Sequence, residues 1–163
     1  MTDSALTESV QPNPAEDWLA ITRLLLRSRQ LDHVEETELV PVRKVFNQFS
    51  ARGHDFAQIL LGSHLAHPND GVTGYYRSRP LALALGLTLD DALAAPLARS
   101  GGYSDGRDIG VVCNLPGGGR LGKGATLLPV SGGVGAQYTP AVGWAQAIAF
   151  RRDEQGSSEW RGA

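Results

Sequence analysis

The stretch Tyr75–Gly86 opens with two aromatic rings and two guanidinium groups, and continues as an apolar run of good helix formers. Pro80 lies near the first position of the expected helix, and Gly86 lies where that helix would stop. A Tyr-Arg pair just ahead of a helix suits a phosphate group, because arginine offers a planar fork of donors and a helix start offers backbone N–H groups. The same residues also fit a surface turn with an arginine-capped helix, so the residues alone leave both interpretations open.

A second stretch with chemical potential is the loop Ser131–Gln137, which reads Ser-Gly-Gly-Val-Gly-Ala-Gln. Small residues let a backbone approach a ligand closely, and backbone carbonyls together with a hydroxyl can hold a cation. The alternative is a tight loop that only leads into a helix, for which Thr139 would be the cap and Pro140 the first residue.

Two further patterns indicate sites less strongly. Gly117–Lys123 is similar to the phosphate-binding loop of nucleotide hydrolases, but Gly124 follows it where a Ser or Thr should reach magnesium, and Pro129 interrupts the helix that should come next. This favours a glycine-rich loop without a nucleotide. His64 and His67 are three residues apart, but no third ligand stands at a suitable spacing for a metal.

The elements that must position these stretches are mostly helical. Capping residues, apolar spacing and prolines predict helices at 14 to about 33, 55–65, 80–86, 89–97 and 140 to about 152. Short extended pieces are expected at 109–112 and 126–130, and a turn at 68–71. Residues 1–13 are predicted to be a disordered tail, and the acidic segment 35–38 a polar link.

Bulk composition excludes several classes of protein. With 163 residues, of which 42% are hydrophobic and 20% charged, the chain is expected to form one domain with a core. A net charge of −2 without a concentrated basic face argues against nucleic-acid binding. No apolar run reaches the length of a membrane span, and Cys113, the single cysteine, allows no internal disulfide. We therefore expect a cytoplasmic protein.

The stretch Tyr75-Tyr76-Arg77-Ser78-Arg79 resembles the Tyr-Arg-Asp-Arg-type segment of the thiamine-diphosphate-dependent 2-oxo acid dehydrogenases, on the alpha chain of the decarboxylating component. The likeness is closest to the branched-chain (2-oxoisovalerate) type and its fused bacterial relatives. Three more stretches recur in the same order, at Lys44–Gly62, Gly106–Asp108 and Ser131–Trp144. Together they span roughly 18–152, and their order and spacing are more specific than any one of them.

This resemblance implies a fold and an activity. The fold is the α/β thiamine-diphosphate-binding fold, of which residues 14–163 would hold the mainly helical amino-terminal part with glycine-rich loops. The activity is oxidative decarboxylation of a branched-chain 2-oxo acid and transfer of the acyl group to a lipoyl carrier. The implied partners are a beta chain or fused beta region and the lipoyl acyltransferase component. A pyruvate- or acetoin-type alpha chain, or a non-catalytic helical remnant that packs on a partner, remain the alternatives.

The resemblance also assigns roles to individual residues. Tyr76 and Arg77, with Tyr75 adjacent, match the residues that hold the diphosphate, whereas Arg79 is expected mainly to support helix packing. In the glycine-rich loop, two residues match the contacts to the aminopyrimidine ring, and three match a potassium site in which Ala136 lacks the expected hydroxyl. The aminopyrimidine residues are Gly132 and Val134, and the potassium residues are Ser131, Gly133 and Gln137.

One part of the family pattern is missing from the sequence. The family binds magnesium through the Asp of a Gly-Asp-Gly stretch and a later Asn, and no Gly-Asp-Gly occurs in this chain. The glutamate of the beta region, which activates the thiamine ring, is absent as well. The chain is therefore expected to be inactive alone, as a fragment, a truncated frame or the product of a split gene.

Overall fold

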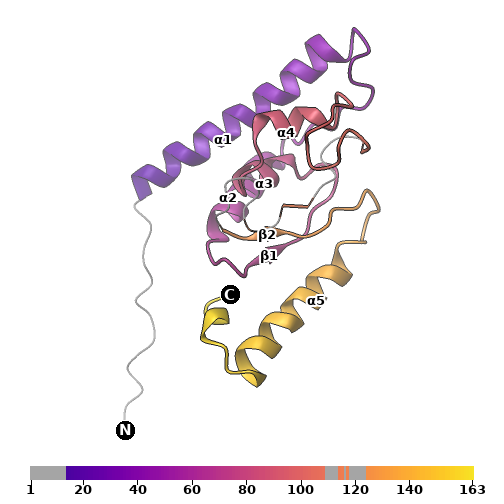
Figure 1. Cartoon of the computed structure of the whole chain (residues 1–163). Helices are drawn as coiled ribbons and strands as arrows, with labels where there is room; N and C mark the ends of the chain where they lie inside the picture. Colours follow the sequence, from indigo (N-terminus) through magenta and orange to yellow (C-terminus); the bar gives the residue numbers. More distant parts are fainter. Residues whose placement is uncertain (1–13, 109–113, 116, 118–123) are drawn as a thin grey trace.

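A computed structural model describes residues 14–108, 114–115, 117 and 124–163, and of the first four of these only the backbone. In this part of the chain the helices outweigh the strands (Figure 1). The α-helices are α1 (Pro14–Val34), α2 (Asp55–His64), α3 (Arg79–Ala84), α4 (Leu89–Ala94) and α5 (Tyr138–Ala149). The strands β1 (Gly71–Val72) and β2 (Thr126–Leu127) are short, as are the helical turns η1 (Glu35–Leu39), η3 (Phe150–Glu154) and η4 (Ser158–Trp160).

The prediction of a polar link after the first helix is wrong. Helix α1 continues without a break into the π-helical turn η1, and the chain leaves the helix only before Pro41. Within η1 the side chain of Glu35 is buried, with 2% of its surface exposed. An acidic residue can be buried when a cationic side chain pairs with it. The partner of Glu35 is far away in the sequence, so the local sequence pattern does not indicate it.

The boundaries of the central helices follow local signals. Helix α3 is short and ends before Gly86, which has φ +97 and so takes the left-handed conformation that glycine tolerates best. Thr88 then caps α4, because its hydroxyl oxygen accepts a hydrogen bond from the backbone N–H of Asp91 at 3.1 Å. The predicted stop at Gly86 is thus confirmed, and Thr88 is a cap that the sequence reading missed.

The predicted cap of the last long helix is wrong by two residues. Helix α5 begins at Tyr138, and Gln137 occupies the cap position without a side-chain hydrogen bond to the helix. The N–H of Ala141 bonds the carbonyl of Gln137 at 3.2 Å, so the glycine-rich loop runs directly into the helix. Thr139 therefore lies inside the first turn, and α5 ends at Ala149 before the π-helical turn η3.

Strand β1 pairs in parallel with β2, so that Gly71 lies opposite Thr126 and Val72 opposite Leu127. Leu115 adds an antiparallel bridge to Leu127. The predicted turn at 68–71 thus ends in a strand, and the predicted extended piece at 126–130 is a strand only at its first two residues. The strand expected at 109–112 and the tail 1–13 lie outside the described residues.

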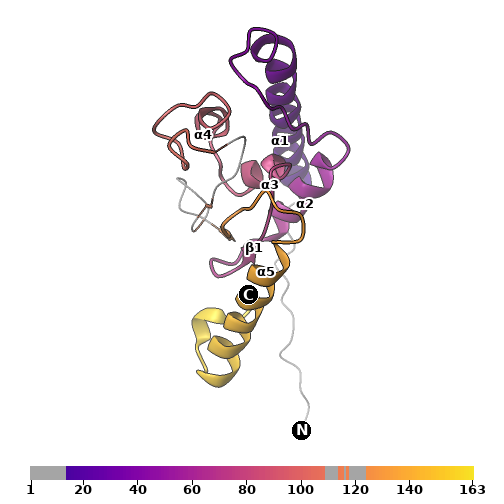
Figure 2. The ribbon, with the colours of Figure 1, turned by 90° about the vertical axis from the view of Figure 1, so that its right-hand side faces the viewer.

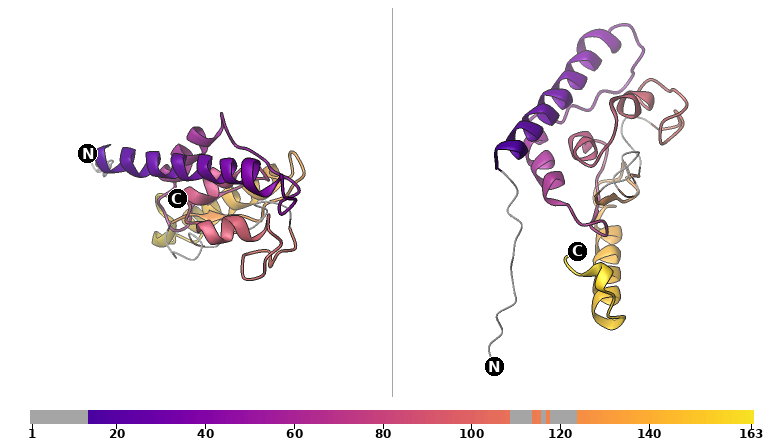
Figure 3. Two further views of the ribbon diagram at one scale, coloured as in Figure 1. Left: turned by 90° about the horizontal axis from the view of Figure 1, so that it is seen from above. Right: turned by 60° about the vertical axis from the view of Figure 1, so that its left-hand side comes forward.

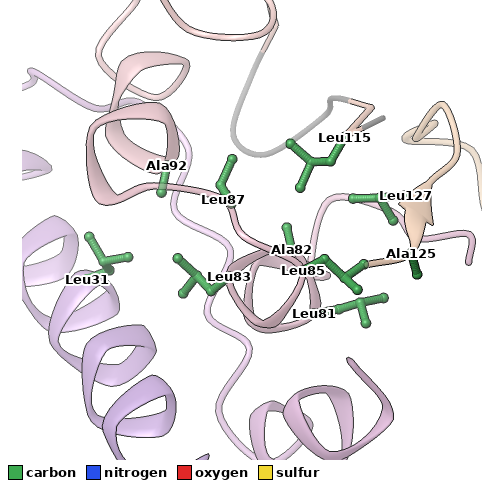
Figure 4. Close-up of a cluster of buried hydrophobic side chains, with 10 residues drawn as sticks. All are labelled: Leu31, Leu81, Ala82, Leu83, Leu85, Leu87, Ala92, Leu115, Ala125 and Leu127. Carbon is green, nitrogen blue, oxygen red and sulfur yellow. The ribbon is translucent and has the colours of Figure 1, made fainter. Parts of the chain in front are cut away.

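The core lies around α3, whose first five residues are all buried. Figure 4 shows that its leucines face α1 on one side and the segment around β2 on the other. The cluster of buried apolar side chains consists of Leu31, Leu81, Ala82, Leu83, Leu85, Leu87, Ala92, Leu115, Ala125 and Leu127.

Helix α5 projects away from this core. In Figures 1 and 2 it extends from the small sheet toward the end of the molecule opposite α1, and the second view of Figure 3 shows it leaving the body. No residue of α5 is buried. Its attachment to β1 therefore decides where the preceding glycine-rich loop lies.

Candidate functional site

The side chain of Trp144 holds α5 against β1. Its indole N–H donates to the carbonyl oxygen of Asn69 at 3.0 Å. A Cβ atom added to Gly71 would lie 2.3 Å from the indole nitrogen, so the ring lies directly on the backbone of β1. This contact brings the loop before α5 beside the segment that follows β1, although the two are far apart in the sequence.

A pocket of about 250 Å³ lies where these two segments meet. Tyr75 contributes to one wall and Val134 to the other, so two residues that the resemblance assigned to one cofactor line the same pocket. Gln137, from the predicted potassium site, also lines it. The full lining is Thr73, Gly74, Tyr75, Ser78, Val134, Gly135, Gln137 and Tyr138.

A tight turn shapes the first wall of this pocket. The N–H of Ser78 bonds the carbonyl of Tyr75 at 2.8 Å, and the Ser78 hydroxyl accepts from the N–H of Tyr75 at 3.1 Å. A Cβ atom on Gly74 would lie 2.9 Å from the Cβ of Ser78, closer than side-chain atoms normally approach. The turn is therefore set by serine hydrogen bonds and by the absence of a side chain at Gly74.

Tyr76 does not line the pocket, because its ring is engaged elsewhere. It lies between Phe49 and Tyr75, with ring centroids 4.6 and 4.4 Å away. The guanidinium carbon of Arg77 stands 5.4 Å from the centre of the Tyr76 ring, a cation–π distance. The three rings form a platform beside the pocket and support the arginine.

Arg77 is half-buried, and its Nη1 donates to the carbonyl oxygen of Ser50 at 2.9 Å. Among the described residues it has no carboxylate partner, whereas the neighbouring Arg79 has two. A guanidinium carries five donors, and the bond to Ser50 uses one of them. A half-buried cation without an acid is a place where an anion gains a charge-assisted hydrogen bond.

Arg79 lies in a buried ion-pair network that the sequence reading did not find. Its guanidinium binds the carboxylate of Glu35 through two hydrogen bonds of 2.5 and 2.9 Å, and that of Asp32 at 2.5 Å. Burial by itself lowers the pKa of Arg79, but these carboxylates outweigh it and hold the pKa above its ordinary value. The i, i+3 spacing of Asp32 and Glu35 was the available signal, since it puts both acids on one helix face.

This network also supports the site. The hydroxyl of Ser50 donates to Asp32 at 2.7 Å, and the N–H of Ala51 donates to the same carboxylate oxygen at 3.2 Å. The carbonyl of Ser50 in turn accepts from Arg77. Arg79 therefore anchors the backbone on which Arg77 rests, in keeping with the packing role predicted for it.

In the glycine-rich loop, Gln137 bonds the backbone of the other two residues predicted to hold potassium. The side-chain N–H₂ of Gln137 donates to the carbonyl oxygens of Ser131 and Gly133, each at 3.1 Å. The hydroxyl of Ser131 accepts from the N–H of Gly133 at 3.1 Å. These residues are the ones that the resemblance assigned to the ion, and each carbonyl oxygen keeps a second lone pair beside its bond to Gln137. The potassium site therefore stays a prediction.

The pocket accommodates only part of a large cofactor. Its volume is just below the range of about 300–1,000 Å³ usual for small-molecule sites, so it suits a single ring rather than a whole dinucleotide-sized ligand. Gly132, the other predicted ring contact, is exposed and does not line it. No group of three or more His, Cys, Asp or Glu side chains suited to a metal exists in the described part of the chain.

The remaining sequence patterns lie apart from this site. Arg107 and Asp108 line a different pocket of about 210 Å³, and the Nε of Arg107 donates to the Ser104 carbonyl at 3.2 Å. The Nδ1 of His67 accepts from the N–H of Asn69 within a turn. Most of the nucleotide-like loop at 117–123 lies outside the described residues, as does Cys113.

The chain matches none of the models of known protein families. In the ranges that the structure describes, no helix combines the length and apolar character needed to cross a membrane. The resemblance set out above therefore rests on the motifs themselves.

Proposed function

We propose that this chain is part of a thiamine-diphosphate-dependent 2-oxo acid dehydrogenase of the 2-oxoisovalerate type, from the alpha chain of its decarboxylating component. The observation that supports the proposal is the common pocket of Tyr75 and Val134. The resemblance assigns both residues to one cofactor, and the docking of Trp144 on β1 brings them to one pocket. A beta chain or beta region and a lipoyl acyltransferase would be its partners, and a branched-chain 2-oxo acid its substrate.

In this proposal the chain binds and orients the cofactor. Val134 would face its aminopyrimidine ring in the pocket, and Gly132 would contact that ring from outside the pocket lining. Arg77 and Tyr76, which do not line the pocket either, would face the diphosphate. When bound, thiamine diphosphate supplies the electron sink that decarboxylation of a 2-oxo acid requires. The remaining donors of Arg77 suit terminal phosphate oxygens, and the rings beside it exclude water from one side. Magnesium ligands would come from a partner region, and the proposal includes no potassium ion.

The test is a calorimetric titration of the purified full chain with thiamine diphosphate and magnesium. We expect saturable binding, and at least about tenfold weaker binding for Arg77→Ala, since tenfold corresponds to about 1.4 kcal/mol. Arg77→Lys should recover part of the affinity, because an ammonium cannot reproduce the planar fork. Arg99→Ala is the matched control, since Arg99 is exposed and lies away from this pocket.

Two results would overturn the proposal. If the parent chain shows no saturable binding, it does not hold this cofactor by itself. If Arg77→Ala binds as tightly as the parent, the alignment of the Tyr-Arg segment with the family is out of register. Circular dichroism of each variant separates a loss of affinity from a loss of folding.

A second function from another class is favoured by the exposure of α5. In this alternative the chain is a non-catalytic helical protein that packs on a partner. Tyr138 and Val142 are 77% and 58% exposed, which is unusual for side chains of their size. Self-association or partner binding without any binding of thiamine diphosphate would favour this non-catalytic function over the enzyme proposal. A separate alternative is a pyruvate-type alpha chain, which a preference for pyruvate in the assembled enzyme would favour.

A further inference from the structure

An exposed aromatic ring borders the pocket beside the glycine-rich loop. Tyr138, the first residue of α5, lines this pocket and is 77% exposed. The edge of its ring lies against Gly135, since a Cβ atom added to that glycine would lie 4.0 Å from both Cδ2 and Cε2 of Tyr138. The N–H of Tyr138 also donates to the carbonyl of Gly135 at 3.3 Å. The loop therefore holds one edge of the ring and leaves most of its surface free for a ligand.

The other large side chains of the pocket also suit a flat ring. Tyr75 comes from the wall after β1, whereas Val134, which is 88% exposed, comes from the same wall as Tyr138. Pockets for small molecules are lined mostly by apolar and aromatic side chains, with a few polar groups that fix the orientation of the ligand. A single ring in this volume of about 250 Å³ would contact side chains of both walls.

Two polar side chains of the pocket have a hydrogen-bonding atom to spare. The amide nitrogen of Gln137 donates its two hydrogens to the carbonyls of Ser131 and Gly133, which leaves Oε1 of Gln137 as an acceptor. The hydroxyl of Ser78 accepts from the N–H of Tyr75 and keeps its own hydrogen to donate. A ring that has an amino group next to a ring nitrogen offers the complementary donor and acceptor.

We propose that Tyr138 stacks on the aminopyrimidine ring of thiamine diphosphate and that Oε1 of Gln137 accepts a hydrogen bond from the amino group of that ring. This inference rests on the proposed function, and it adds two contacts to Val134 and Gly132, which the resemblance assigns. The phenol ring binds the face of the aminopyrimidine. The hydrogen bond selects for the amino group, because an oxo group in its place would set two acceptors against each other.

The first test titrates the full chain with the aminopyrimidine half of thiamine as its free alcohol, which carries no phosphate, and follows binding by NMR of the ligand. We expect saturable binding that is at least about fivefold weaker in Tyr138→Ala, because stacking on the phenol ring is lost. Tyr138→Phe should bind as the parent does, since it keeps the ring face. Val142→Ala is the matched control, because Val142 is 58% exposed on the same helix but does not line the pocket. Circular dichroism shows whether the variants keep the parent's helix content.

The second test measures selectivity for the amino group by calorimetry. The parent should bind thiamine diphosphate at least about tenfold more tightly than the analogue in which an oxo group replaces the amino group. Gln137→Met should bring this ratio of affinities close to one. A change that only disturbs the loop would weaken both ligands alike and leave the ratio as it is in the parent.

Three results would overturn this inference: no binding of the free ring by the parent, equal affinities of the parent and Tyr138→Ala for that ring, or an unchanged ratio in Gln137→Met. Binding of thiamine diphosphate that depends on Arg77 would still support the proposed function in each of these cases. A parent that binds the free ring but not thiamine diphosphate would instead overturn the proposed function and leave a binding site for the ring.

Discussion

Arg77 and Arg79 are two residues apart, yet their surroundings give them different roles. Arg79 is 5% exposed and bound to two buried carboxylates, which neutralise its charge inside the protein. Arg77 is half-buried, stacks on Tyr76 and donates to a backbone carbonyl. Of the two, only Arg77 has guanidinium donors left for an anionic ligand. Arg79 is therefore a structural cation, whereas Arg77 is a candidate binding residue.

Replacement of Arg79 by methionine should destabilise the fold strongly. Asp32 and Glu35 would remain buried without their cation, a change that typically costs about 3–5 kcal/mol. Urea denaturation, followed by circular dichroism, measures the change in the free energy of unfolding. Arg52→Ala is the control, since its pair with Glu36 is exposed and such pairs contribute less than about 1 kcal/mol. Equal stabilities of the two variants would contradict the network's role.

Asp55 should make stability depend on pH in the acid range. Burial by itself raises the pKa of Asp55, but the Arg29 guanidinium at 2.8 Å and the N–H of Phe56 hold that pKa below its ordinary value. A lowered folded-state pKa contributes stability above the unfolded pKa of about 3.9, and this stability is lost as pH falls through the folded value.

The stability difference between the parent and Asp55→Asn should therefore be constant near neutral pH and shrink below about pH 4. Urea midpoints of both proteins, measured from neutral to acid pH, test this. A difference that grows on acidification would show that the pKa of Asp55 is not lowered in the folded protein.

Gln137 should make the glycine-rich loop independent of potassium. Since its amide already bonds the carbonyls of Ser131 and Gly133, the thermal midpoint of the parent should be the same in potassium and choline chloride at equal ionic strength. Gln137→Glu would place an anionic oxygen near these carbonyls, so this variant should be less stable and regain stability with potassium. A midpoint of the parent that rises in potassium would show that the ion displaces the amide.

At the scale of elements, the docking of α5 on β1 decides whether the pocket exists. Trp144 attaches the helix through its ring, which lies on Gly71, and through its bond to Asn69. Figure 1 shows α5 beyond the small sheet, away from the core around α3. Loss of this one contact would separate Tyr75 from Val134.

Gly71→Ala should undock the helix. The added Cβ would lie 2.3 Å from the Trp144 indole nitrogen, so the ring must move, and overpacking of this kind costs about 1–3 kcal/mol. Tryptophan fluorescence should shift toward that of an exposed indole, and urea denaturation should show the loss. Gly143→Ala is the control, because nothing lies within 4 Å of its added Cβ, and alanine favours a helix. Unchanged fluorescence in Gly71→Ala would contradict this docking.

At the scale of the molecule, the described part of the chain combines a helical core with a site at its periphery. The core around α3 joins α1, α4 and the segment around β2, as Figure 4 shows. The pocket lies between the turn after β1 and the start of α5. One of its walls is formed by the start of α5 and the loop before it, and no residue of α5 is buried.

The chain by itself should not decarboxylate a 2-oxo acid. The sequence has no Gly-Asp-Gly stretch, and the described residues contain no acidic cluster for magnesium. The assay is reduction of an artificial electron acceptor with a branched-chain 2-oxo acid, thiamine diphosphate and magnesium. Turnover above a blank without protein would contradict the expectation. If the rate stays at the level of the blank while the chain still binds the cofactor, the chain binds thiamine diphosphate but does not catalyse the reaction alone.

Local signals predicted much of the secondary structure correctly. Pro80 lies in the first turn of α3, and Gly86 follows its end. The helices predicted to begin near 55 and 89 do so, although α4 ends at Ala94 rather than at 97. These signals act between residues a few positions apart, where backbone geometry and nearby side chains decide the conformation. The predicted cap at Thr139 was wrong because turns of the glycine-rich loop continue into the helix.

By itself, then, the sequence determined where the helices form, the stop at Gly86 and the presence of two motifs with ligand-binding chemistry. The tertiary structure decided which of those residues meet. Glu35 is a buried helical residue rather than part of a link because Arg79, 44 residues away, neutralises it. Tyr75 and Val134 share a pocket because an indole lies on a glycine backbone. Both contacts join distant parts of the chain, and local propensity contains no information about them.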